Sequence, residues 1–117
     1  MAFACYGITT ITIPNTITTI EDYAFIGCND LVHITIPESV TSMGTATFWK
    51  CSSLKTVYCK PSTPPSAVFG GDSQWLPFDG NASGRKIYVS AESVNSYRNA
   101  NYWSRYASAI VAEGDSS

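Results

Sequence analysis

Four cysteines and a single histidine are the residues of this sequence with the richest side-chain chemistry. They are Cys5, Cys28, Cys51, Cys59 and His33. Thiolates form disulfides, bind zinc and act as nucleophiles, and imidazole serves as a metal ligand or general base. The first three cysteines are spaced 23 residues apart, no C-x-x-C pair occurs, and one histidine is too few for a common zinc motif. The cysteines therefore follow a regular step rather than a metal-binding pattern.

The equal spacing of the cysteines predicts a ladder of buried thiols. Stacked strands lie roughly 4.8 Å apart, which is within reach of a disulfide, but equivalent Cβ vectors point in parallel rather than toward each other. A disulfide remains the alternative. Cys59 occupies an inward position that matches Ile36, which favours a core thiol over a nucleophile. No serine, cysteine or carboxylate is placed beside His33 by the spacing, so we expect no enzymatic activity.

Carboxylates recur around the expected turns but lack the spacing of a cation site. Glu21, Asp22, Asp30 and Glu38 show no D-x-D pattern of a calcium loop. We interpret them as solvated turn residues and predict neither a metal nor another cofactor.

Three tryptophans raise the possibility of sugar binding, because aromatic rings stack on the apolar faces of sugars. Trp103 is assigned to the closing end of the fold. Trp49 is expected to face outward from a turn and Trp75 lies in a loop-like segment, so these two define the alternative glycan-binding site.

An internal repeat organises these residues. The segment Ile11-Thr12-Ile13-Pro14 returns as Ile34-Thr35-Ile36-Pro37, and Phe25, Cys28 and Leu31 return as Phe48, Cys51 and Leu54, each after 23 residues. Self-similarity at this spacing predicts a β-rich solenoid, in which each repeat buries its apolar side by stacking on its neighbours.

Alternating polar and apolar residues predict four half-buried strands, at residues 10–13, 34–36, 56–59 and 86–89. Pro14 is expected to end the first strand and turn the chain, after which Ile17 and Ile20 point inward. The outward positions should align in two rows: Thr10, His33, Thr56 and Lys86, then Thr12, Thr35, Tyr58 and Tyr88. These rows are either soluble β-formers or a protein-binding surface with the two tyrosines as anchors.

The chain is expected to form one domain with three parts. Residues 1–60 carry the repeats, residues 61–84 form an inserted loop, and residues 85–113 supply a capping strand and short helices. Ser90 is a candidate N-cap residue. The apolar residues Val68, Phe69, Trp75, Leu76 and Phe78 predict that the loop folds back over the last coil, and Trp103, Tyr106 and Ile110 form a helical stripe that seals the end.

Composition restricts the partners. Seven basic residues stand against nine acidic ones without a basic stripe, so nucleic-acid binding is not expected. No apolar run is long enough to span a membrane, and a secretory leader is missing from the start. Because the first repeat begins part-way, we interpret the chain as the C-terminal piece of a longer protein. Its open N-terminal end would permit self-association.

The repeat resembles a known family. The pattern L-x-x-I-T-I-P-x-x-V-T-x-I-x-x-x-A-F-x-x-C, carried here by Leu31 to Cys51, is similar to the BspA-like, or TpLRR-type, leucine-rich repeat of bacterial surface proteins. Thr47 stands where the family usually has alanine, and Met43 fills the last aliphatic position. The ending, from Val57 to Lys60 and from Arg85 to Val94, resembles the segment that closes such arrays.

The resemblance implies a non-enzymatic protein at the cell surface or outside the cell. Its stacked strands would bind a host or microbial macromolecule, with a protein favoured over a glycan. The alternatives are a carbohydrate-binding module that uses Trp49 and Trp75, or an end piece whose role is to close a longer array.

Overall fold

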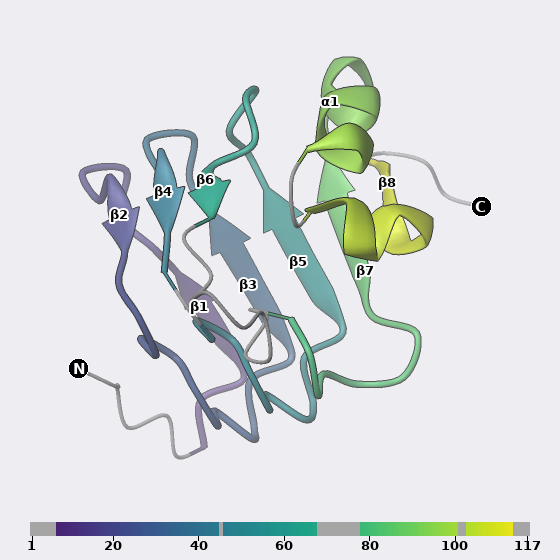
Figure 1. Ribbon diagram of the computed structural model, residues 1–117. Coiled ribbons are helices and arrows are strands. Elements are labelled where there is room, and N and C mark those ends of the chain that lie inside the picture. The colour runs from purple at the N-terminus through teal and green to yellow at the C-terminus, as the bar shows by residue number, and fades with distance from the viewer. Residues whose placement is uncertain (1–6, 45, 68–77, 101–102, 114–117) are drawn as a thin grey trace.

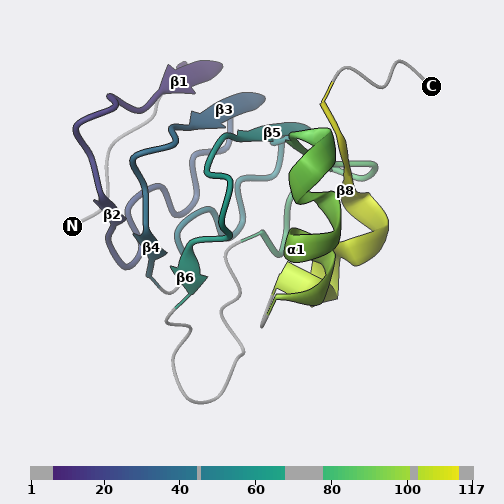
Figure 2. The same ribbon diagram turned by 90° about the horizontal axis from the view of Figure 1, so that it is seen from above.

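The computed structural model describes residues 7–44, 46–67, 78–100 and 103–113. These residues form two parallel sheets on opposite sides of a coiled chain (Figures 1 and 2). The larger sheet contains, in spatial order, β1 (Thr10–Thr12), β3 (His33–Ile36), β5 (Thr56–Cys59), β7 (Lys86–Val89) and β8 (Ile110–Ala112). The smaller sheet contains β2 (Thr19–Ile20), β4 (Ser42–Met43) and β6 (Ser66–Ala67).

Strand register brings equivalent residues of successive coils side by side. Thr10 pairs with His33 and Ile87 pairs with Ile110, and the partners in both pairs are 23 positions apart. Because side chains alternate along a strand, Ile34 and Ile36 point inward and are fully buried. A one-residue shift of register would move these groups to the solvent side.

Phenylalanine rings fill the middle of the coils as a stack. Phe25 and Phe48 lie 5.3 Å apart between ring centroids with planes 3° apart, and Phe48 and Phe78 lie 5.5 Å apart with the same angle. Phe78 supplies a third ring from the end of the predicted loop, as expected for a segment that folds back over the last coil. The other residues of that apolar cluster, Val68, Phe69, Trp75 and Leu76, lie outside the described residues.

The segment that follows Phe78 is fastened to the coils by side chains. The Asn81 amide donates to the backbone oxygen of Phe48 at 3.0 Å, and Arg85 Nη2 donates to the oxygen of Phe78 at 2.9 Å. Arg85 Nε donates to the Asn81 side-chain oxygen at 3.2 Å. Asn81 and Arg85 therefore hold the returning chain in the position from which β7 can extend the sheet.

Short helices lie at the C-terminal end of the sheets (Figure 1): η1 (Ala91–Ser93), α1 (Val94–Asn99) and η2 (Trp103–Ala109). Tyr97 and Trp103 are buried, and their rings meet edge to face with centroids 5.1 Å apart. Trp103 Nε1 donates to the backbone oxygen of Pro65 at 3.0 Å, so the indole has a partner for its polar group. The placement of Trp103 at the closing end is confirmed.

The prediction that Ile110 belongs to a helical stripe is wrong. Ile110 begins β8, which pairs with β7 as a fifth strand of the larger sheet. β-branched Ile110 and Val111 favour a strand, and they lie one repeat step after Ile87 and Tyr88. Arg98 Nη2 donates to the backbone oxygen of Ile110 at 2.7 Å and so fastens β8 to α1.

Ser90 is an N-cap residue by position but not by its side chain. Its hydroxyl donates to the Ser93 hydroxyl at 3.0 Å, whereas no side-chain cap bond to the backbone is made. The Ser93 N–H instead donates to the backbone oxygen of Ser90 at 2.9 Å, the i to i+3 bond of a 3-10 turn. The tight first turn thus replaces the predicted side-chain cap.

The inward direction predicted for Ile17 is also wrong. Ile17 is 37% exposed, whereas Ile20 is 3% exposed as expected. The equivalent of Ile17 one step later, Val40, is 1% exposed. Val40 is covered by the first coil, and Ile17 lies at the outer side of that coil.

Strand β6 lies inside the range that the sequence assigned to an inserted loop. Ser66 pairs with Ser42 and Ala67 pairs with Met43, so the third coil reaches the smaller sheet before the chain departs from the repeat. Two prolines at 64 and 65 precede this strand and restrict the backbone to extended conformations. Pairing therefore continues at least to residue 67.

Thr47 carries an unsatisfied hydroxyl in the core. The residue is fully buried, and Oγ1 has no hydrogen-bond partner in the described part of the chain. Ala24 occupies the equivalent position one step earlier. We expect Thr47→Val to raise the free energy of unfolding by about 1 kcal/mol, because it removes the desolvated hydroxyl and keeps the side-chain shape.

Urea denaturation followed by circular dichroism measures this change. Thr35→Val is the matched control, since Thr35 is half-exposed on β3 and its replacement should change stability by no more than about 0.5 kcal/mol. A loss of stability in Thr47→Val would show that the hydroxyl has a partner.

Candidate functional site

The outward side chains of the larger sheet form what we term the strand face. Residue pairing places Thr10, His33, Thr56 and Lys86 side by side in one row. The same pairing places Thr12, Thr35, Tyr58 and Tyr88 in a second row. All eight are at least partly exposed. The structure therefore brings together the eight residues that the sequence proposed for protein binding.

Tyr58 and Tyr88 form an aromatic pair on the strand face. Their ring centroids lie 5.5 Å apart with planes inclined by 28°, and both residues are half-buried. The pair is continued by Val111 of β8, which is opposite Tyr88 and also half-exposed. Sequence reasoning missed Val111 because it assigned that segment to a helix, although the distance of 23 residues from Tyr88 was a signal.

A charged pair borders the aromatic pair. Lys60 Nζ lies 2.6 and 2.8 Å from the two carboxylate oxygens of Glu113 and 5.8 Å from the centroid of the Tyr58 ring. The two charged side chains are 41% and 39% exposed, so the ion pair adds little to stability. Its effect is to fix the ammonium group beside Tyr58.

His33 is exposed on the strand face and shows no catalytic arrangement. Among the residues that the structure describes, none gives the His33 imidazole a hydrogen-bonded carboxylate, hydroxyl or thiol. A general base needs a substrate or nucleophile within hydrogen-bond reach and usually a group that orients it. His33 contributes a polar surface group to its row.

The predicted thiol ladder is wrong at Cys28. Cys28 takes part in a disulfide bond, whereas Cys51 and Cys59 are buried free thiols. The parallel Cβ vectors that disfavour a disulfide apply to positions in register, and Cys51, the in-register neighbour of Cys28, does remain a thiol. The prediction of a core thiol holds for Cys51 and Cys59.

Burial makes both free thiols poor nucleophiles. Desolvation raises the pKa of Cys51 to about 11, although hydrogen bonds from the backbone of Cys28 and Gly27 oppose the shift. Desolvation likewise raises the pKa of Cys59 to about 12. The Cys59 thiol donates to Tyr97 Oη at 3.3 Å, and Tyr97 Oη donates to the backbone oxygen of Pro61 at 2.6 Å. These contacts belong to the core.

The two residues of the alternative glycan site have different outcomes. Trp49 is half-buried rather than fully outward, and Lys50 Nζ lies 4.6 Å from the centroid of its ring. An ammonium group thus occupies part of the surface that a sugar would need. Trp75 lies outside the described residues.

Neither a metal centre nor a membrane span is found in the part of the chain that the structure describes. No three histidine, cysteine or acidic side chains gather closely enough there to bind a metal ion. None of the helices described is long and apolar enough to cross a bilayer.

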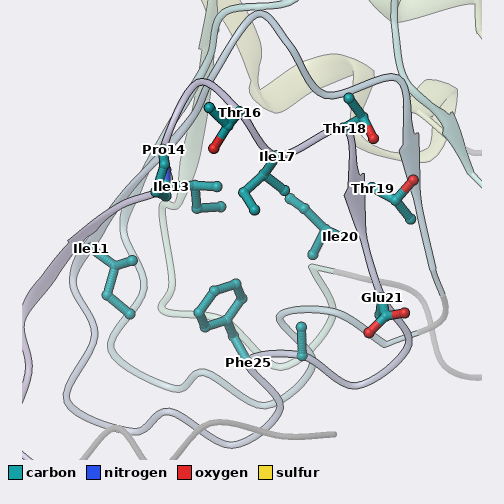
Figure 3. Close-up of a pocket in the computed structure, with 11 residues that line it drawn as sticks. Ile11, Ile13, Pro14, Thr16, Ile17, Thr18, Thr19, Ile20, Glu21 and Phe25 are labelled. Atoms are coloured by element: carbon teal, nitrogen blue, oxygen red, sulfur yellow. The ribbon is translucent and has the colours of Figure 1, made fainter.

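The largest hollow, of about 640 Å³, opens at the N-terminal side of the first coil. Figure 3 shows Ile13, Ile17, Ile20 and Phe25 pointing into it, whereas Thr18 and Thr19 point away. Ile17 and nearby Ile8 and Tyr23 are the most exposed large apolar residues described. This hollow is the inner surface of a coil rather than a chemically equipped pocket.

Comparison with protein families agrees with this architecture. The family model of the BspA type leucine rich repeat region (6 copies) matches residues 1–73, more than half of the chain. The chain belongs to the BspA-type leucine-rich repeat family. A comparison with curated proteins found no match.

Membership of the BspA-type family bears on function in general terms. Repeats of this type are commonly protein-interaction or adhesion modules and are generally non-enzymatic, and such proteins are typically found at bacterial surfaces or secreted. The matched range contains every strand up to β6, whereas Tyr88 lies beyond it.

The raised pKa values of the two free thiols predict that both resist alkylation. At pH 8 the folded protein should lose neither Cys51 nor Cys59 to iodoacetamide, because both are protonated and covered. Addition of urea should make both react at the rate of an ordinary thiol. Peptide mass spectrometry of the alkylated chain measures this, and modification of Cys59 before unfolding would contradict its burial.

Proposed function

We propose that this BspA-type repeat is a non-enzymatic protein-interaction or adhesion module that binds its partner through the strand face. The aromatic pair is the observation that carries the proposal. Tyr58 and Tyr88 present a large, ordered, partly exposed surface that no described residue covers completely. Tyrosine combines large contact area with few rotatable bonds, which makes it a frequent centre of protein interfaces.

The surroundings of the aromatic pair support a protein partner. Threonine, histidine and lysine in the adjoining positions give a polar rim around an aromatic and aliphatic centre, with Val111 extending the centre. An apolar centre with a polar rim is the usual organisation of protein interfaces. The paired charges of Lys60 and Glu113 add directional hydrogen-bonding groups at one side.

The proposed architecture is a solenoid with a 23-residue repeat whose C-terminal end is closed by the helices. Two features support the closing role. Tyr97, Trp103 and Tyr106 turn their rings toward the core, and the outer side of α1 carries exposed Asn95 and Ser96. A polar outer face is what a terminal cap requires for solubility.

We place the protein at the cell surface or outside the cell, with a host or microbial surface macromolecule as its partner. The Cys28 disulfide supports this placement, because disulfides persist in oxidising compartments. Nucleic acid is not a proposed partner, since the chain has a net charge of −2 and lacks a basic stripe.

A second proposal is that the chain acts only as the end piece of an array. The buried Trp103 and its bond to Pro65 favour a closing role for the C-terminal part. In that case the binding surface would be supplied by other repeats.

The strand-face proposal predicts a loss of binding when the aromatic pair is removed. The wild-type chain and Tyr58→Ala and Tyr88→Ala would be tested against immobilised extracellular-matrix proteins by surface plasmon resonance. Each substitution should weaken binding about tenfold or more, as expected for an aromatic residue at an interface centre. Tyr23→Ala is the matched control, because Tyr23 is 44% exposed and lies away from the strand face.

The same experiment separates the alternatives. Binding that survives both strand-face substitutions would overturn the strand-face proposal. Glycan-array binding that is lost in Trp49→Ala would favour the carbohydrate module instead. An absence of binding to either panel would support the end-piece proposal.

We further propose that the chain self-associates through the open side of the first coil. Ile17 is 37% exposed beside the apolar hollow, and burial of such groups drives association. The wild-type chain should therefore form larger species at high concentration in static light scattering. Ile17→Ser should shift the distribution toward monomer, whereas Val111→Ser on the strand face should leave it unchanged. A monomeric wild type over the whole concentration range would contradict the proposal.

A further inference from the structure

Two polar hollows meet at the turns that follow the strands of the larger sheet. One has a volume of about 320 Å³ and the other of about 490 Å³, and Asn15 and Glu38 line both. Thr35 and Lys60 complete the polar lining of the first, and Ser39 and Ser62 complete the second. We term the combined feature the turn groove. It lies beside the strand face and across successive coils.

Repetition of one turn places the two central groups of the turn groove side by side. The N–H of Ile17 donates to the oxygen of Pro14, and the N–H of Val40 donates to the oxygen of Pro37, both at 3.1 Å. Asn15 and Glu38 therefore occupy the same position in two turns of the same kind. Adjacent strands lie about 4.8 Å apart, so an amide and a carboxylate face the groove at about that spacing.

Neither central group is used by the fold. No other described residue makes a hydrogen bond with the Asn15 amide or the Glu38 carboxylate. The Ser39 hydroxyl donates to the backbone oxygen of Ile17 at 2.7 Å, which fixes the second turn on the first and leaves the hydroxyl oxygen as an acceptor. The groove thus offers a donor and several acceptors on an ordered base.

The charges of the turn groove select the class of ligand. Lys60 is already neutralised by Glu113, with Nζ 2.6 Å from one carboxylate oxygen, so it attracts anions weakly. Glu38 repels anions, and the Lys60 ammonium group disfavours a cation close to it. The groove therefore suits an uncharged ligand that both donates and accepts hydrogen bonds.

We propose that the turn groove binds a neutral sugar unit. A carboxylate accepts hydrogen bonds from two neighbouring hydroxyls, and an amide both donates to and accepts from them. Pro37 adds an apolar surface at the base for the C–H side of a sugar ring. This role goes beyond the proposed protein binding and uses neither Trp49 nor the aromatic pair.

The test is a titration of the ¹⁵N-labelled 117-residue chain with methyl β-D-glucopyranoside, methyl α-D-mannopyranoside and N-acetylglucosamine. At least one probe should cause saturable shifts centred on the amides of Asn15, Glu38 and Ser62. Asn15→Ala and Glu38→Ala should each weaken binding about fivefold or more, since each removes a hydrogen-bonding partner. Glu92→Ala is the matched control, because Glu92 is an exposed carboxylate on η1 outside the groove.

Three results would overturn the proposal. The first is an absence of saturable shifts with any of the three sugars. The second is sugar binding that persists in the Asn15→Ala, Glu38→Ala double variant. The third is tighter binding of glucuronate or of N-acetyl-lysine methylamide, which would assign the groove to charged ligands. Tyr88→Ala should leave sugar binding intact, so failure of the strand-face proposal can be distinguished from failure of this one.

Discussion

In-register stacking of successive coils is the constraint on which the rest of the structure depends. The parallel pairing that places Ile11 beside Ile34 also places Phe25 on Phe48 and aligns the outward side chains in rows. A single register therefore determines the core, the exposed face and the spacing of the turns. Since a shift of one residue would exchange the inward and outward sets, all three features stand or fall together.

The stacking constraint also explains how the chain tolerates an irregular segment. Phe78 reaches the ring stack although it follows residues that depart from the repeat, and its ring is as parallel to Phe48 as that of Phe25. The position is fixed by what the stack requires rather than by the distance along the chain. Asn81 and Arg85 then satisfy the backbone oxygens of Phe48 and Phe78, and burial lowers the pKa of Arg85. A desolvated guanidinium that still donates hydrogen bonds is consistent with a structural role.

Sequence reasoning succeeded where one period governed the residue and failed where two influences competed. The outward rows followed from alternation and the repeat step alone, so Tyr58 and Tyr88 could be paired in advance. Ile110 fitted both a helical stripe and the repeat step, and strand pairing prevailed. Ile17 was assigned by analogy with Val40, but the analogy holds only where another coil covers the position. The turn groove was missed because the turns had been interpreted only as solvated.

The division between inward and outward positions has a consequence for function. Inward positions of the larger sheet are aliphatic or cysteine in every coil, because each must fit between the same neighbours. Outward positions share no such requirement, and one row contains Thr10, His33, Thr56 and Lys86 without a common chemistry. Stability therefore places few demands on the strand face or on the first residues of the turns. Chemical identity at these positions can vary with a ligand while the register that supports them stays unchanged.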